Sequence, residues 1–187
     1  MKQNLIPEHR VLGEVTKAIS EGIDVNPVLI KPESSLIKDL GAESLDFLDI
    51  NYRLEQTFGI KMARRSVLDH MEELFGEESA IDSEGKLTDK AVRVLALRYD
   101  ESGKQVQAGM DMDEMPAMVT VSSIVEGVVN LLDSLPEKCI NCGAGNWSLN
   151  DETLIHCGSC GDAATFTNGD DLIQIWLKQI QENEKIF

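Results

Sequence analysis

The chain has 187 residues, of which 42% are hydrophobic, and this is enough apolar content for a core in one domain or in two small ones. Acidic residues outnumber basic residues 33 to 17, and the net charge of −16 would repel a phosphate backbone, so we expect no nucleic-acid partner; the charge either favours basic protein surfaces or serves solubility alone. No apolar run reaches the roughly 20 residues of a membrane span and the N-terminus lacks a signal-peptide core, so we expect a cytoplasmic protein.

Apolar residues recur at helical spacings of three and four in five segments that precede the cysteines. These predicted helices cover residues 8–21, 43–58, 60–75, Thr88 to about Tyr99, and 120–135. Gly59 supplies a stop for the second helix, and Thr88 supplies an N-cap for the fourth. Residues 101–118 show no periodicity and hold four of the seven methionines, which either fill gaps under a loop or line an adaptable binding surface.

The second predicted helix begins with a serine between two carboxylates, in the stretch DLGAESLDFLDI at residues 39–50. The first turn of a helix has unpaired backbone N–H groups and the positive end of the helix dipole. A phosphate esterified to Ser44 would therefore lie where negative charge is stabilised. The simpler interpretation is that Ser44 is an ordinary N-cap.

The longer stretch SSLIKDLGAESLDFLDI, at residues 34–50, resembles the attachment signature of acyl carrier proteins. In that family a serine that follows an acidic residue at the start of the second helix carries 4′-phosphopantetheine. Two features depart from the pattern: Glu43 stands where the family usually has aspartate, and residues of about 62–118 form an insertion before a helix that resembles the family's last one. The resemblance implies a mainly α, acyl-carrier-like helical bundle with an insertion after its second helix, and it implies that Ser44 is the attachment site.

The resemblance also implies a carrier that is not itself an enzyme, and no grouping of acid, base and nucleophile in the sequence indicates otherwise. A phosphopantetheinyl transferase would attach the arm to Ser44, and the arm would then hold an acyl or related carboxylic group as a thioester. Acyl-transferring or acyl-processing enzymes with basic docking patches would use that group in fatty-acid, lipid or secondary-metabolite biosynthesis. The alternative is a protein-docking scaffold that keeps the carrier fold without the prosthetic group.

The second predicted helix is where the resemblance places the surface that docks partners. The implied docking residues are Glu43, Asp46, Leu48, Asp49, Tyr52 and Glu55. Arg53 either narrows the choice of partners or pairs with Asp49 on the helix surface. Four apolar residues of the same helix either border a cavity for an acyl chain or form plain core: Leu45, Ile50, Leu54 and Phe58.

Four cysteines form two CxxCG turns near the C-terminus: Cys139, Cys142, Cys157 and Cys160. Each turn directs two thiolates at one ion, and four thiolates complete the tetrahedron that zinc prefers, although rubredoxin-like iron or a redox dithiol pair would use the same residues. His156 is an alternative ligand. A closed site of this kind leaves no position for substrate, so it stabilises a fold rather than catalysing a reaction. Cysteines in this pattern also favour a reducing compartment.

Two short β-prone runs separated by Asn150-Asp151 lie between the cysteine turns, which predicts a hairpin, and the whole resembles a zinc ribbon. After it, Asp170 is the predicted cap of a helix whose apolar stripe packs on the ribbon, on the carrier domain or on a partner. We therefore predict two domains: residues 1–136 as the helical carrier domain, and residues 137–187 as a small β zinc ribbon with a C-terminal helix.

Overall fold

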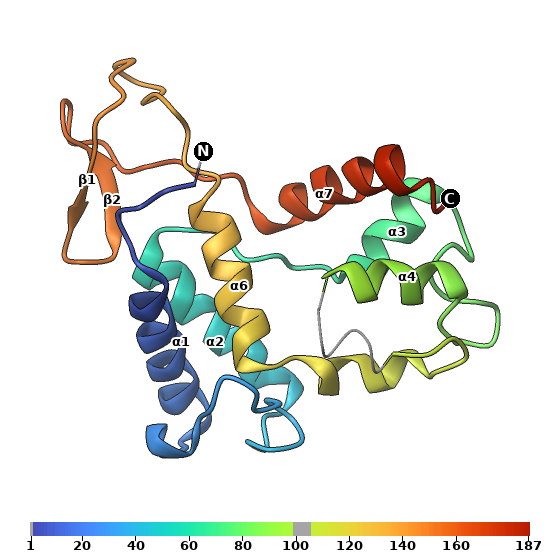
Figure 1. The fold of residues 1–187 in the computed structure, drawn as a ribbon. Helices are drawn as coiled ribbons and strands as arrows, with labels where there is room; N and C mark the ends of the chain where they lie inside the picture. Colours follow the sequence, from blue (N-terminus) through green and yellow to red (C-terminus); the bar gives the residue numbers. More distant parts are fainter. Residues whose placement is uncertain (1, 99–105) are drawn as a thin grey trace. The chain divides into compact units, whose positions relative to one another are not determined.

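The computed structural model describes residues 2–98 and 106–187 (Figure 1). The elements are α1 (Glu8–Ile23), η1 (Pro27–Leu29), α2 (Ser44–Phe58), α3 (Val67–Phe75), α4 (Asp89–Arg98), η2 (Met112–Met118), α6 (Val121–Leu132), β1 (Trp147–Asn150), β2 (Leu154–Cys157) and α7 (Gly169–Glu184). The structure confirms the predicted class, which is mainly helical with a small two-stranded sheet and a cluster of four cysteines. None of the described helices combines the length and the apolar character that crossing a membrane requires.

The third predicted helix is shorter than its apolar pattern indicates. It begins at Val67 instead of residue 60, because backbone groups in the preceding stretch bond to side chains. The N–H of Met62 donates to the carboxylate of Glu55 at 2.8 Å, and Ser66 caps α3 by accepting the N–H of Asp69 at 3.1 Å. These bonds use groups that a longer helix would need for its own ladder.

The described chain divides into two compact units. The first contains the described parts of Met1–Met62 together with Thr120–Asn168, and the second contains those of Ala63–Val119 together with Gly169–Phe187. Helices α1, α2 and α6 thus share a unit with the cysteine ribbon, whereas α3, α4 and α7 belong to the other unit. The predicted domain boundary between residues 136 and 137 follows the family resemblance rather than compactness, and it stays a prediction.

In the first unit α1 packs against both α2 and α6. Each helix has one apolar side, and the side chains there are buried: Val11, Val15 and Ile19 of α1, Ile50, Leu54 and Phe58 of α2, and Val128 and Leu132 of α6. A Cβ added to Gly22 would lie only 3.0 Å from Cγ1 of Ile50, so the missing side chain lets α1 and α2 approach closely. Burying one such aliphatic side chain contributes about 1.5–3 kcal/mol, which makes this core the main support of the helix that presents Ser44.

The loop between α1 and α2 is tied by backbone pairing to the start of α6. Ser35 and Thr120 form an isolated antiparallel bridge, and the N–H of Ser122 donates to the carbonyl of Pro32 at 2.8 Å. The chain that returns from the insertion therefore joins the loop that leads to Ser44. The middle of that loop is therefore held to α6 by backbone hydrogen bonds.

Strands β1 and β2 form the predicted antiparallel hairpin, with Asn150 opposite Leu154. Its turn contains Glu152, whose φ of 67° lies in the left-handed region and whose carboxylate pairs with Arg10 of α1. Strand β2 contacts α2, and a Cβ added to Gly59 would lie 3.5 Å from Cδ2 of Leu154. The ribbon therefore packs on the C-terminal end of α2, at the opposite end of that helix from Ser44.

The second unit has a separate core in which Met71 of α3, Leu95 of α4 and Leu177 of α7 are fully buried. The rings of Phe75 and Phe187 stack in the same unit with their centroids 3.9 Å apart. From the sequence we expect the apolar stripe of α7 to pack on the ribbon, on the carrier domain or on a partner. In the structure it packs on helix α3 of the insertion.

Asp170 does not cap α7 in the way that we predict from the sequence. The helix begins one residue earlier, at Gly169, and the Asp170 carboxylate accepts hydrogen bonds from three other groups. The backbone N–H groups of Arg64 and Arg65 donate to it at 3.1 Å each, and Nε2 of the buried His70 donates at 2.9 Å. This carboxylate therefore joins the two sequence segments of the second unit.

The methionine-rich stretch fills gaps with part of its side chains, and its use as a binding surface stays a prediction. Met110 and Met115 pack against the core of the second unit, and Met112 is exposed. Tyr99, which we predict on the apolar side of the fourth helix, lies outside the described residues, as do residues 101–105 of the stretch itself.

Candidate functional site

Ser44 is the first residue of α2, and it is exposed. The N-cap position belongs to Glu43, whose backbone is extended at φ −105° and ψ 168°, so Ser44 is not the ordinary N-cap of the simpler interpretation. The Asp46 carboxylate accepts the N–H of Glu43 at 2.7 Å and fixes the first turn. Among the described residues the Ser44 hydroxyl has no hydrogen-bond partner, so no group there competes for it.

The turn before α2 is held by short-range hydrogen bonds. The Asp39 carboxylate accepts the N–H of Ser35 at 2.8 Å, and the N–H of Ala42 donates to the carbonyl of Leu36 at 2.8 Å. Gly41 has a φ of 75°, which lies in the left-handed region that glycine adopts without strain. The motif residues upstream of the serine therefore build the turn that starts α2.

One side of α2 next to the serine is exposed and partly apolar. Its large apolar side chains are 75%, 56% and 58% exposed and belong to Leu45, Leu48 and Tyr52. Among the acidic residues implied for docking, Glu43 is exposed and Asp46 and Asp49 are half-buried. Five of the six implied docking residues are thus accessible in the described structure: Glu43, Asp46, Leu48, Asp49 and Tyr52.

Glu55 does not belong to that exposed side of α2. Its side chain is 4% exposed, its carboxylate accepts the N–H of Met62 at 2.8 Å, and it pairs with Nζ of Lys61 at 3.8 Å. The expectation for this residue is therefore corrected: Glu55 closes the turn that follows α2. Nε of Arg53 donates to Asp49 at 2.7 Å, which confirms the interpretation that Arg53 pairs with that acid.

The four residues considered for an acyl cavity fall into two groups. Ile50, Leu54 and Phe58 are buried and belong to the core of the first unit, whereas Leu45 points to solvent. Phe58 also lines a cavity at the end of α2. The plain-core interpretation therefore holds for Ile50 and Leu54.

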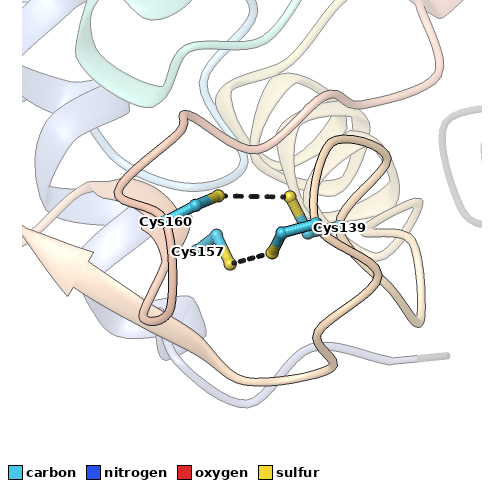
Figure 2. Close-up of side chains that lie close together, drawn as sticks. Cys139, Cys157 and Cys160 are labelled. Atoms are coloured by element: carbon cyan, nitrogen blue, oxygen red, sulfur yellow. Dashed lines mark hydrogen bonds between the residues drawn. The ribbon is translucent and has the colours of Figure 1, made fainter.

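The four cysteine sulfurs converge in the first unit, and every pair of Sγ atoms lies within 4.8 Å. Figure 2 shows the sulfur of Cys160 facing that of Cys139. These two sulfurs lie 3.7 Å apart, and the sulfurs of Cys142 and Cys157 lie 3.5 Å apart. Four sulfurs at the usual zinc distance of about 2.3 Å form a tetrahedron with edges of about 3.8 Å. The cluster therefore fits a single metal ion.

Glycines end both cysteine turns in the left-handed conformation. Gly143 has a φ of 75° and donates its N–H to the carbonyl of Cys139 at 2.8 Å. Gly161 has a φ of 81° and donates to the carbonyl of Cys157 at 2.9 Å. The two turns are therefore built alike, as the repeated motif requires for two pairs of ligands.

Backbone dipoles favour the thiolate form of one cysteine. The N–H groups of Cys160 and Ser159 lower the pKa of Cys157 to about 7, so this thiol ionises more readily than a free cysteine. His156 is not part of the described cluster: its Nε2 lies 3.2 Å from Oγ of Ser148. The sulfur of Cys157 and not the adjacent imidazole is therefore the ligand that this strand offers.

A family model of known proteins matches the part of the chain that contains Ser44. The family model described as a phosphopantetheine attachment site matches residues 13–71, which include α2, part of α1 and the start of α3. The acyl carrier protein AcpXL of Rhizobium meliloti is 47% identical over 49 residues, which are 26% of this chain and 52% of that protein. The acyl carrier protein of Helicobacter pylori is 37% identical over 49 residues, 26% of this chain and 63% of its own length.

The acyl carrier protein of Wolinella succinogenes is 35% identical over 52 residues, which are 28% of this chain and 68% of that protein. The chain spans about half the length of the AcpXL relatives that it matches. No solved structure matches it significantly. The family model covers the exposed serine at the start of α2. With a relative 35% identical over 68% of its own length, the chain belongs to the acyl carrier protein family.

Proposed function

We propose that this chain carries an acyl or related carboxylic group as a thioester on 4′-phosphopantetheine attached to Ser44, and that it is not itself an enzyme. The main support is the exposed Ser44 hydroxyl, which begins α2 inside the matched family segment and has no partner among the described residues. The terminal thiol of the arm supplies the thioester. Backbone N–H groups in the first turn of α2 lack intrahelical partners and would stabilise the phosphate.

The exposed side of α2 is the surface that we propose for a phosphopantetheinyl transferase and for acyl-transferring or acyl-processing enzymes. It consists of Glu43, Asp46, Leu48, Asp49 and Tyr52. Acidic groups accelerate encounter with basic patches, and the desolvated apolar side chains supply affinity. Arg53 pairs with Asp49 and offsets the charge of that carboxylate. The acyl groups that these enzymes take from the carrier would enter fatty-acid, lipid or secondary-metabolite biosynthesis.

We propose that the four cysteines hold one zinc ion with a structural role. The sulfur distances support this, because they match the edges of a zinc tetrahedron. Four ligands from the chain leave no open coordination position, and a segment with so small a core depends on the ion for its fold. Cysteines arranged as metal ligands favour a reducing compartment and so support the expected cytoplasmic location, which stays a prediction.

The test is the intact mass of the protein after incubation with coenzyme A and a phosphopantetheinyl transferase of broad specificity. Ser44→Ala removes the proposed attachment site, and Ser122→Ala is a matched control, since Ser122 is an exposed serine in the first turn of α6. We expect the wild type and Ser122→Ala to gain one phosphopantetheine each and Ser44→Ala to gain none. A folded wild type that gains no mass would contradict the carrier function and favour the docking scaffold.

A Glu43→Asp variant belongs in the same experiment, because it restores the residue that the family usually has before the serine. Its loading rate should equal or exceed that of the wild type, since both side chains carry the same charge. Loading of the wild type at less than a tenth of the variant's rate would show that the extra methylene of Glu43 restricts which transferases act on the chain.

A further inference from the structure

A cavity of about 210 Å³ lies where the cysteine ribbon meets the end of α2. Its apolar walls are formed by Phe58, Leu154, Ile155, Ala163, Ala164 and Phe166. Asn150 and His156 are the polar side chains among its described lining residues, which include no lysine, arginine, aspartate or glutamate. Such a site suits an uncharged and mainly apolar group.

One side of α2 leads from Ser44 to this cavity. At 100° per residue, Asn51, Glu55 and Phe58 lie within about 40° of the line that Ser44 defines along the helix. The fourteen steps between the fifteen residues from Ser44 to Phe58 correspond to a rise of about 21 Å. Along this line Ser44 is exposed, Asn51 is half-buried and Phe58 is buried at the junction with the ribbon. Glu55 is buried at the turn that contains Lys61 and Met62.

The length of the arm limits which cargo can reach the cavity. About thirteen bonds separate phosphorus from sulfur in phosphopantetheine, which is the bond count of four to five residues and gives a reach of about 15 Å. The thioester would therefore end about 6 Å short of Phe58, a gap that about five carbons bridge. The cavity itself has the volume of about seven water molecules at about 30 Å³ each.

We propose that this cavity holds the distal carbons of an acyl chain of about 8 to 12 carbons that is tethered at Ser44. The inference rests on the proposed carrier function and assigns the ribbon a part in it, since Leu154 and Ile155 come from β2. An acetyl group is too short to enter and stays in solvent. The cargo class that fits is a medium-length, uncharged acyl group.

A second hollow competes for the same chain. It is a groove of about 750 Å³ between α1 and α6, with Leu12, Val125 and Val129 among its lining residues. Carboxylates such as Glu126 and Asp133 also line this groove. Burying an alkyl chain there would desolvate these charges, whereas the described lining of the ribbon cavity holds no charged side chain.

The test compares protein loaded at Ser44 from acetyl- and from decanoyl-coenzyme A, with intact mass verifying each loading. Methyl groups are then observed by ¹³C-labelled NMR. We expect decanoyl to shift the methyl signals of Leu154, Ile155 and Ala164, and acetyl to leave them in place. Decanoyl shifts confined to Leu54 or to Val129, or no shifts in verified loaded protein, would overturn the inference while leaving the carrier function intact.

Thioester cleavage by hydroxylamine supplies a second readout, with each rate taken relative to that of the free acyl-coenzyme A. Hydroxylamine should cleave the decanoyl thioester at least threefold more slowly than the acetyl thioester. Ala164→Phe fills the cavity and should abolish this protection, whereas Val129→Phe, which fills the competing groove, should retain it. If Ala164→Phe does not fold, the comparison of the two acyl groups on the wild type still decides. Failure of loading itself would refute the carrier function and this inference with it.

Discussion

Replacing Asp170 by alanine tests how the two sequence segments of the second unit are joined. The Asp170 carboxylate accepts hydrogen bonds from Nε2 of His70 at 2.9 Å and from the backbone N–H groups of Arg64 and Arg65 at 3.1 Å each. These donors are not equivalent, because His70 is 1% exposed whereas Arg64 and Arg65 lie at the surface. The substitution therefore leaves one donor buried without its acceptor.

The buried donor dominates the expected cost. Water replaces the carboxylate at the two exposed backbone N–H groups, so their contribution is small. A buried polar group that loses its partner costs about 1–3 kcal/mol, and a charged acceptor places the value in the upper part of that range. We therefore expect Asp170→Ala to lower the free energy of unfolding of the second unit by about 2–3 kcal/mol.

Amide hydrogen exchange separates the effect on the second unit from effects on the first. A loss of this size accelerates exchange at Leu177, in the core of the second unit, by about 30- to 150-fold. Val15, in the core of the first unit, should exchange at an unchanged rate. Glu182→Ala is the matched control, because Glu182 is an exposed acid on the same helix. Equal exchange at Leu177 in wild type and Asp170→Ala would refute the assigned role.

The same carboxylate predicts a pH dependence. Burial alone would raise the pKa of Asp170, but hydrogen bonds from His70 and from the N–H groups of Arg64 and Arg65 outweigh it and hold the pKa below its ordinary value. A carboxyl group with a lowered pKa stabilises the fold above its ordinary pKa of about 4 and loses this contribution as the pH falls through the lowered value. The difference between wild type and Asp170→Ala should be full at neutral pH and shrink below about pH 4.

Two further predictions concern the first unit. In urea unfolding, Gly59→Ala should lower the free energy of unfolding of this unit by about 1–2 kcal/mol, because Gly59 has a φ of 68°. Gly13→Ala, at an exposed position inside α1, should raise it by up to about 1 kcal/mol. Equal effects of the two substitutions would contradict the assigned end of α2. Elemental analysis should find one zinc per chain in the wild type and less zinc in Cys142→Ala. In a Trp176→Phe background, removal of the metal by a chelator should shift the fluorescence of Trp147 to the red, because the indole N–H of Trp147 donates to the carbonyl of Pro136 at 2.8 Å. Full zinc content in the cysteine variant would exclude the four-thiolate site.

Contiguous patterns predict the elements that carry the candidate site. The apolar spacing of α2 and its stop at Gly59 depend on neighbouring residues alone, and so do the paired cysteine turns. Glu55 differs, because its place on α2 is next to exposed side chains and its residue type suits a surface. It is buried because the chain turns back after Gly59 and brings the N–H of Met62 to its carboxylate. Helical spacing alone does not reveal this return of the chain.

Contacts between residues far apart in the chain cannot be read from the sequence. An aspartate at the start of a helix fits a cap, yet Asp170 accepts from Arg64, which lies 106 positions earlier. Periodicity likewise identifies the apolar side of α7 but not the helix that covers it. The cavity beside Phe58 belongs to the same class, because its walls come from α2 and from a ribbon about 90 residues further along the chain.

The split composition of the second unit imposes an order on its folding during synthesis. Residues Ala63–Val119 leave the ribosome before the 49 residues Thr120–Asn168, and only then does α7 follow with Leu177. At about 5–20 residues per second, the apolar sides of α3 and α4 wait about 2–10 s for the helix that completes their core. All of the first unit is made before α7. The helices that present Ser44 can therefore pack together earlier than the second unit, whose core needs α7.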